Sequence, residues 1–405
     1  MGGRRAWLLL TAIVLTGVNL RTAVTTVGPL LEELQRGLGM SPGVAGLLTT
    51  LPVVCFAVLG SVTPALVRRF GEQAVVAGAL AVTSAGLLAR ALAGSVWVFL
   101  LMSVLALAGG AVGNVVLPAL VKRHFPERTG AVVAAYTTAL AAGQAAGAAL
   151  AVPVARFAGE QGWRLGIGIW AAMAALAVLP WLPLLAVRRD RDGTAGVAPR
   201  STGLAHTRLA WALALFFGTQ SAQAYIVFGW FAQFFRETGV SAARAGLLAA
   251  SVSVLVIPMS LLVPSLAGRM RTQRPIVLVL TACCVLAYIG MLTAPVAGAW
   301  LWMLLVGLGL GLFPLALTMI GLRARSAATT GALSAFVQGI GYVLAGTGPL
   351  LVGVLRGVTG GWGAPFALMF ALCAVMIIVG WYAAGDRYVE DELRSPAPAP
   401  IDNVR

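Results

Sequence analysis

The sequence predicts an all-α membrane protein built from two pseudo-symmetric bundles of six transmembrane helices. Of its 405 residues, 60% are hydrophobic and only 10% are charged. Apolar runs of about 20 residues recur along nearly the whole chain, and each is long enough to cross a hydrocarbon core ~30 Å thick as a helix. The second half of the chain also repeats landmarks of the first half in the same order.

Twelve apolar segments qualify as membrane spans. They cover residues 7–31, 44–67, 73–93, 96–121, 130–155, 165–187, 209–235, 245–267, 275–294, 299–322, 327–355 and 364–384. With the N-terminus in the cytoplasm, twenty of the 28 basic residues fall on the cytoplasmic side, seven fall outside, and Arg21 lies within the first span. This bias predicts cytoplasmic N- and C-termini. It also indicates that the net charge of +15 sets the membrane orientation and contacts lipid headgroups, and that it does not bind nucleic acid.

The repeat has an offset of 200 residues near the start of each half. It relates Ala45-Gly46-Leu47-Leu48 to Ala245-Gly246-Leu247-Leu248, Ser41 to Ser241, Pro64 to Pro264 and Arg69 to Arg269. The long polar stretch at 188–208 is rich in Gly, Pro, Ser and Arg, which is typical of a flexible linker. We therefore expect an N-terminal bundle at 1–187, a cytoplasmic linker at 188–208, a C-terminal bundle at 209–385 and a cytoplasmic tail at 386–405.

Arg21 is a formal charge set deep inside an apolar helix, and we take it to be the only one. A guanidinium stays protonated and presents five donors in a planar fork that suits small oxyanions. A charge inside a membrane costs at least ~2.5 kcal/mol, which favours a role in a substrate or ion pathway. The alternative is structural: Arg21 extends to the outer headgroups, or it pairs with Glu32 or Glu33 further along the chain.

Several chemistries are excluded by what the spans lack. All thirteen acidic residues lie in loops, at span ends or in the tail, and His124 and His206 lie in cytoplasmic segments. The membrane interior therefore offers no titratable relay, no partner for an organic cation, and no base or metal cluster for catalysis. No phosphate-binding G-x-x-x-x-G-K-[ST] loop is present. We expect a protein that is not an enzyme and that holds no cofactor and no metal.

Polar side chains follow helical spacing in the spans expected to face a central site. The fifth span carries Tyr136 and Gln144, and the eleventh carries Ser334, Gln338 and Tyr342 at i, i+4 and i+8. The first, fourth and seventh spans add Asn19, Arg21, Thr25, Asn114, Gln220, Ser221 and Tyr225. We predict that these residues bind substrate, with the exception of Ser334, which belongs to the polar stripe of the eleventh span but is not assigned to the site. The alternative for each amide or tyrosine is a hydrogen bond between helices.

Four strings carry a family resemblance over nearly all of the chain. They are NLRTAVTTVGPLL at 19–31, AGLLTTLPV at 45–53, FFGTQSAQAYIVFGW at 216–230, and the long segment 307–362. The chain resembles the cyanate permease and 2-nitroimidazole transporter family of the major facilitator superfamily. The resemblance implies a carrier of small anionic or nitro-bearing solutes in the bacterial inner membrane. Two departures from the wider superfamily are Arg68, where an acid is usual, and Ala148 after Gly147, where drug antiporters have proline.

Three functions remain open from the sequence. The first is alternating-access transport of a small anion such as cyanate, nitrite or nitrate, and the second is transport or export of a neutral or nitro-aromatic compound. The third is a receptor or channel, which we disfavour because the sequence shows a duplicated fold without an output domain or a filter. We expect a monomer in a lipid bilayer that binds a small-molecule substrate.

Overall fold

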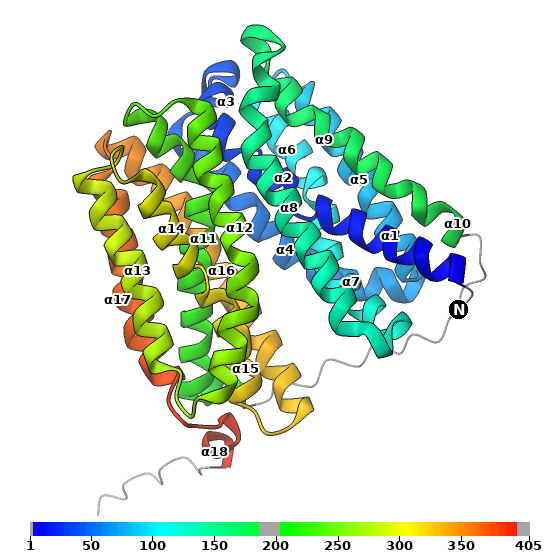
Figure 1. The fold of residues 1–405 in the computed structure, drawn as a ribbon, viewed down its shortest axis with the longest axis vertical. Helices are drawn as coiled ribbons and strands as arrows, with labels where there is room; N and C mark the ends of the chain where they lie inside the picture. Colours follow the sequence, from blue (N-terminus) through cyan, green and yellow to red (C-terminus); the bar gives the residue numbers. More distant parts are fainter. Residues whose placement is uncertain (1–2, 186–202, 395–405) are drawn as a thin grey trace, which may run out of the picture.

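The computed structural model describes residues 3–185 and 203–394, and within these ranges the chain forms helices and turns without a β-strand (Figure 1). The N-terminal bundle contains α1 (Gly3–Asn19), α2 (Thr22–Thr25), α3 (Leu31–Leu38), α4 (Pro42–Phe70), α5 (Glu72–Ala91), α6 (Val96–Ala106), α7 (Ala108–His124), α8 (Thr129–Arg156), α9 (Trp163–Val178) and α10 (Leu182–Leu185). The C-terminal bundle contains α11 (Arg208–Glu237), α12 (Ala242–Arg269), α13 (Arg274–Thr293), α14 (Ala299–Gly309), α15 (Leu312–Leu322), α16 (Ala327–Thr359), α17 (Gly363–Ala383) and α18 (Val389–Arg394).

The predicted helical membrane fold is confirmed, and eleven described segments are long and apolar enough to cross a membrane. The predicted seventh span, 209–235, is helix α11, which is 30 residues long but is not among the eleven. Its polar residues are tolerated because nearly every side chain of α11 is buried against other helices rather than facing lipid. Most of the predicted linker, 188–202, lies outside the described residues, and α11 already begins at Arg208.

Four predicted spans are interrupted. The sixth span divides at the 3-10 turn Leu179–Trp181, between α9 and α10. The first span was expected to be one helix, but it divides into α1, α2, the short 3-10 turn Gly28–Leu30, and α3. The fourth span divides at Leu107 between α6 and α7, and the tenth divides at Leu310 and Gly311 between α14 and α15. The fourth and tenth spans occupy equivalent places in the two halves, so the repeat extends to their interruptions.

The repeat also fixes where two matching helices begin. The Ser41 hydroxyl accepts a hydrogen bond from the backbone amide of Val44 at the start of α4 (3.4 Å). At the offset of 200, the Ser241 hydroxyl accepts one from the amide of Arg244 at the start of α12 (3.4 Å). Serine at this position satisfies one of the free amides of the first turn, so one sequence signal starts the same helix in both halves.

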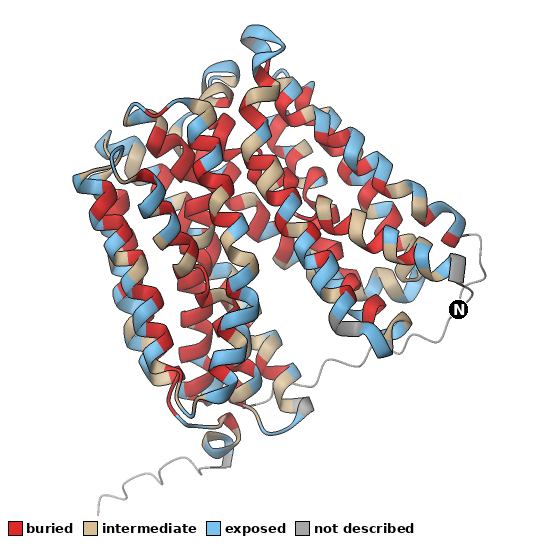
Figure 2. Cartoon of the chain, in the orientation of Figure 1, coloured by how far each residue is buried: buried red, intermediate tan, exposed pale blue. Residues whose placement is uncertain are grey.

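The two bundles converge at the end of the molecule that carries α3 and diverge toward the opposite end (Figure 1). We call the α3 end the closed end. Buried residues continue from one bundle to the other there, while exposed residues cover the outward faces (Figure 2). Those outward faces carry large apolar side chains such as Leu176, Leu261 and Ile378, which are 59%, 66% and 70% exposed. Apolar exposure on this scale fits contact with lipid.

Small residues make the contacts at the closed end. A Cβ atom on Gly353 of α16 would lie 2.6 Å from the carbonyl oxygen of Pro42 and 2.8 Å from the Cα of Gly46 in α4. The Thr50 hydroxyl donates to the carbonyl of Gly346 (3.0 Å) in the same crossing. In the matching crossing of α8 with α12, a Cβ on Gly246 would lie 2.7 Å from the carbonyl of Ala148. Both crossings therefore depend on backbone contact.

We predict that Gly353→Ala shifts the molecule away from closure of this end. The added methyl group meets backbone that cannot rotate away, and such overpacking costs about 1–3 kcal/mol. Spin labels at Phe157→Cys and Arg244→Cys, in a protein without its four native cysteines, should report a larger population at long distance. Gly357→Ala is the matched control, because its Cβ would lie 3.6 Å from Pro42, an ordinary contact. Equal distance distributions in the two variants would contradict the prediction.

Candidate functional site

Arg21 stands at the interruption of the first span. It precedes α2 with non-helical dihedrals (φ −131°, ψ 0°). The neighbouring side chains bond to local carbonyls: the Asn19 amide donates to Leu15 (2.9 Å), and the Thr26 hydroxyl donates to Thr22 (2.9 Å). Asn and Thr side chains that bond to nearby backbone in this way compete with the helical ladder. The run of such residues around Arg21 therefore explains why the helix stops there.

The charge of Arg21 has no ion-pair partner among the residues that the structure describes. Its Nε is buried and makes no hydrogen bond. The sequence left open a pairing with Glu32 or Glu33, but these carboxylates instead bind Arg36 and Arg236. That alternative is wrong, because the interruption of the span places α3 and its acids in a contact with the other bundle.

Two tyrosines of the C-terminal bundle face this charge. The guanidinium is close enough to Tyr225 of α11 and Tyr342 of α16 to interact electrostatically with both hydroxyls. Tyr225 packs in a small cluster with Phe56 of α4, and Tyr342 lies at the edge of the same cluster. The ring of Tyr342 also meets Phe217 edge to face, with centroids 5.2 Å apart. The structure thus joins Arg21 of one half to an aromatic wall of the other.

Other predicted residues keep polar atoms available. Gln338 and Ser334 are half-buried on the same face of α16 as Tyr342, and the Gln338 amide donates to the Ser334 hydroxyl (2.7 Å). The remaining members are Asn114, which is exposed on α7, and Tyr136 and Gln144, which are largely buried on α8. None of these three side chains has a hydrogen bond to a described residue, so each is free to meet a ligand or water.

Four predicted residues make local bonds instead. The Gln220 amide donates to the carbonyl of Phe217 (3.0 Å) and to the Ser221 hydroxyl (2.6 Å) within α11. The buried Thr25 hydroxyl donates to the carbonyl of Arg21 (3.2 Å). Asn19 is also buried, and its amide is bonded within α1. The donor groups of these side chains are therefore used in local hydrogen bonds. The side-chain amide oxygens of Asn19 and Gln220 are buried and have no hydrogen-bond partner.

Sequence reasoning missed a buried arginine beside this site. Arg90, assigned from the sequence to an outer span end, is 1% exposed in α5 and donates to the carbonyl of Ala23 (3.2 Å) and the Thr26 hydroxyl (3.4 Å). The expectation that Arg21 is the only deeply placed charge is therefore wrong. Helical periodicity could have indicated this burial, because Arg90 lies seven residues after Thr83 and three after Leu87, on the same buried face of α5.

A family model described as Major Facilitator Superfamily matches residues 9–346. The chain belongs to this superfamily. It is 34% identical over 383 residues to the uncharacterized transporter YycB of Bacillus subtilis, covering 94% of each chain. It is 32% identical to the 2-nitroimidazole transporter of Escherichia coli, covering 96% of this chain and 98% of the relative. With the cyanate transport protein CynX of Escherichia coli it shares 31% identity over 92% and 95% of the two chains.

Solved structures agree with the fold. A bacterial homologue of the human lysosomal transporter Spinster, inward-facing and occupied, superposes with a TM-score of 0.75 at 18% identity, over 97% of this chain and 99% of that one. A D-xylose–proton symporter gives 0.71 at 15% identity, over 95% and 99%. The protein is thus a multi-pass membrane transporter of the major facilitator superfamily that moves a small molecule.

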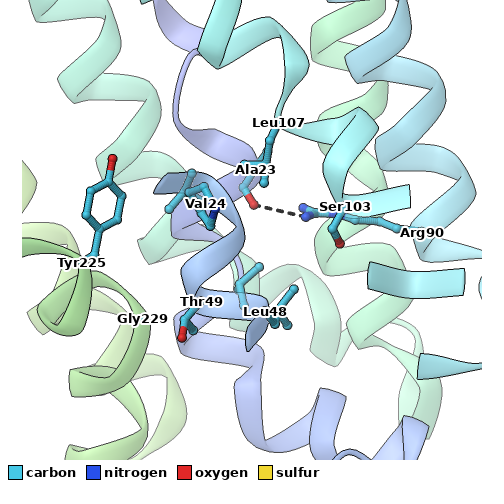
Figure 3. A pocket seen from close by; sticks show the side chains of 11 residues that line it. Ala23, Val24, Leu48, Thr49, Arg90, Ser103, Leu107, Tyr225 and Gly229 are labelled. Atoms are coloured by element: carbon cyan, nitrogen blue, oxygen red, sulfur yellow. Dashed lines mark hydrogen bonds between the residues drawn. The ribbon is translucent and has the colours of Figure 1, made fainter. Parts of the chain in front are cut away.

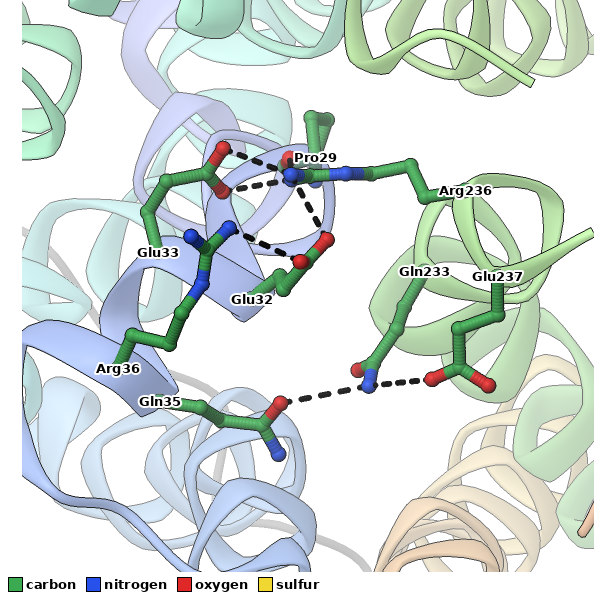
Figure 4. Close-up of polar contacts among 8 residues, drawn as sticks. All are labelled: Pro29, Glu32, Glu33, Gln35, Arg36, Gln233, Arg236 and Glu237. Carbon is green, nitrogen blue, oxygen red and sulfur yellow. Dashed lines mark hydrogen bonds and ion pairs between the residues drawn. The ribbon is translucent and has the colours of Figure 1, made fainter. Parts of the chain in front are cut away.

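Polar contacts also join the two halves of this facilitator at its closed end (Figure 4). The Arg236 guanidinium of α11 contacts Glu33 of α3 through both terminal nitrogens (2.6 and 2.8 Å), and it contacts Glu32 at 2.8 Å. It also donates to the carbonyl of Pro29 (2.9 Å). The Arg236 side chain is only 10% exposed, so solvent screens these contacts less than it screens a surface pair.

We predict that Arg236→Gln destabilises the closed end by about 1–3 kcal/mol, between the values for exposed and buried ion pairs. The same pair of spin labels, at positions 157 and 244, should shift toward long distance. Arg36→Gln is the matched control, because Arg36 is 69% exposed and pairs with Glu32 inside α3, not across the halves. Similar shifts in both variants would show that the crossing pair makes no special contribution.

Proposed function

We propose that this facilitator carries a small monovalent anion, of the cyanate, nitrite or nitrate class, between the two bundles. One observation carries the proposal: the Arg21 guanidinium lies within electrostatic range of Tyr225 and Tyr342 of the other half and has no acidic partner among the described residues. A charge without a counter-charge inside a membrane protein is unfavourable, and a bound anion lowers this free-energy cost. The planar fork of arginine also matches a small oxyanion in geometry.

A second candidate substrate is a nitro-aromatic compound. The aromatic wall of Phe217, Tyr225 and Tyr342 offers ring surfaces, and nitro oxygens accept hydrogen bonds from a guanidinium. One relative is named as a 2-nitroimidazole transporter. We rank this candidate second because it leaves the positive charge of Arg21 without a counter-charge.

We also propose that both chain termini lie in the cytoplasm of a bacterium, with the protein in its inner membrane; the positive-inside distribution of basic residues supports this orientation. In this orientation the closed end faces outward, and the two bundles diverge toward the cytoplasm (Figure 1). We propose that the bundles at 1–187 and 209–385 rock as two units about the site, as monomers, with 188–208 joining them and 386–405 as a cytoplasmic tail.

We predict that Arg21→Gln lowers transport of cyanate or nitrate into proteoliposomes by at least about tenfold, because it removes charge-assisted hydrogen bonds. Arg21→Lys should retain part of the activity, since an ammonium keeps the charge but loses the bidentate fork. Arg164→Gln is the control: Arg164 is a half-buried arginine of the same bundle that binds the carbonyls of Ala91 and Ala93 (2.7 and 2.9 Å), away from this site.

Near wild-type anion transport by Arg21→Gln would refute the anion site. If the same variant instead lost transport of labelled 2-nitroimidazole, the nitro-aromatic candidate would replace the anion. Circular dichroism and gel filtration of each purified variant separate these outcomes from misfolding.

We also predict that transport does not use a proton gradient. The spans place Arg21 at the site but no Asp, Glu or His, so no side chain there exchanges a proton at neutral pH. Nitrate is a suitable probe because its own protonation stays constant. With the membrane potential clamped, an imposed pH gradient should leave its accumulation unchanged, whereas 100 mV should shift it by ~2.3 kcal/mol. Uphill nitrate accumulation that follows the pH gradient would contradict this.

A further inference from the structure

Arg90 is a full charge enclosed by protein without a counter-charge. It is 1% exposed, and no acidic side chain pairs with it in the described part of the chain. Its guanidinium donates two hydrogen bonds, to the carbonyl of Ala23 and to the hydroxyl of Thr26, while its buried Nε has no partner. A guanidinium has five N–H donors, so these contacts leave most of them unused.

A small cavity lies beside this charge (Figure 3). Arg90 and Ser103 line one side, Ala23 and Thr49 lie along it, and Tyr225 borders it from the other bundle. The space open to the centre of a water-sized sphere is ≈ 20 Å³. A cavity of this size holds a water molecule, a halide or part of a linear triatomic anion, and it is too small for an aromatic ring.

The unused hydrogen-bond donors of the cavity come from Arg90 and Tyr225. The Ser103 hydroxyl already donates to the carbonyl of Phe99 (2.7 Å), and the Thr49 hydroxyl donates to the carbonyl of Ala45 (3.1 Å). The Tyr225 hydroxyl has no hydrogen bond to a described residue, and the Arg90 guanidinium retains unused donors. The anion preference of the cavity therefore comes from the positive charge and free N–H groups of Arg90, with the Tyr225 hydroxyl as a second available donor.

Tyr225 connects this cavity to the first site. It borders the cavity and also interacts with the charge of Arg21. Arg21 begins the short segment 21–26, and Arg90 donates to Ala23 and Thr26 of the same segment. Gly229 and Thr49, which come from different halves, meet at the closed-end side of the cavity. Separation of the halves there would therefore expose the Arg90 side first.

We propose that the cavity beside Arg90 is a second binding position for a small monovalent anion, on the closed-end side of Arg21. The anion passes between the two arginines past Tyr225, so each arginine serves one side of the membrane. This inference rests on the proposed function in one respect: it assumes that the anion bound near Arg90 is the same anion that Arg21 binds. A halide ion held permanently at Arg90 would also be a small monovalent anion, and the test below distinguishes it from the transported anion.

The test uses azide, a linear triatomic anion, as an infrared probe of the purified full-length protein in nanodiscs. Wild type should show two populations of bound azide. Arg21→Gln should lose one and keep the other, and Arg90→Gln should show the reverse. Arg164→Gln, which removes another carbonyl-binding arginine of the same bundle, should keep both. Displacement of the Arg90-dependent population by cyanate and nitrate identifies the transported anion, and displacement by chloride alone identifies a resident halide.

A second variant that keeps Arg90 is needed, because Arg90→Gln by itself could lose azide binding through misfolding. Val24→Phe fills the cavity from its lining and should remove the same population as Arg90→Gln. The second position is overturned if Arg21→Gln abolishes all bound azide, or if both cavity variants leave the spectrum unchanged. In either case the Arg21 site and the proposed function stand. A wild type that binds neither azide, cyanate nor nitrate overturns the proposed function as well.

Discussion

The interruption of the first span is the constraint on which the rest of the site depends. Backbone groups freed from a helix inside a membrane need partners within the protein, since lipid offers none. Here threonine hydroxyls bond back along the chain, and Arg90 reaches across from α5 to the carbonyl of Ala23. The same interruption directs Arg21 toward the other bundle and places α3 where its acids meet Arg236. If residues 20–27 formed a continuous helix, the contact of Arg90 with Ala23, the approach of Arg21 to the other bundle and the contact of the α3 acids with Arg236 would all be lost.

The duplicated halves use a shared scaffold for different chemistry. Both begin their second helix with a serine cap, and both supply a small residue where that helix crosses its neighbour. At the site, the N-terminal half adds Arg21 and the buried Arg90, whereas the C-terminal half adds the tyrosines and Gln338. Charge is therefore concentrated on one wall and neutral donors and rings on the other. A ligand held between them contacts both halves, which links its binding to their relative position.

Closure at the α3 end combines two kinds of contact. The helix crossings at Gly353 and Gly246 bring backbones together, and the network around Arg236 adds charged hydrogen bonds at the rim. Behind these contacts lies an apolar cluster that includes Leu30 and Leu48 of one half and Phe228 and Leu248 of the other. The helix crossings and the charged hydrogen bonds suit a surface that must part and re-form.

The sequence by itself determined the helical membrane fold, its duplication and the superfamily, because hydropathy, serine caps and repeated small residues act locally. It also singled out Arg21, Tyr225 and Tyr342, since a charge or a polar stripe inside an apolar span is visible without coordinates. Tertiary structure decided which polar groups were already engaged: Gln220 and Thr25 bond locally, while Arg21 does not. It alone revealed Arg90, because burial depends on what packs around a helix end and not on distance along the chain.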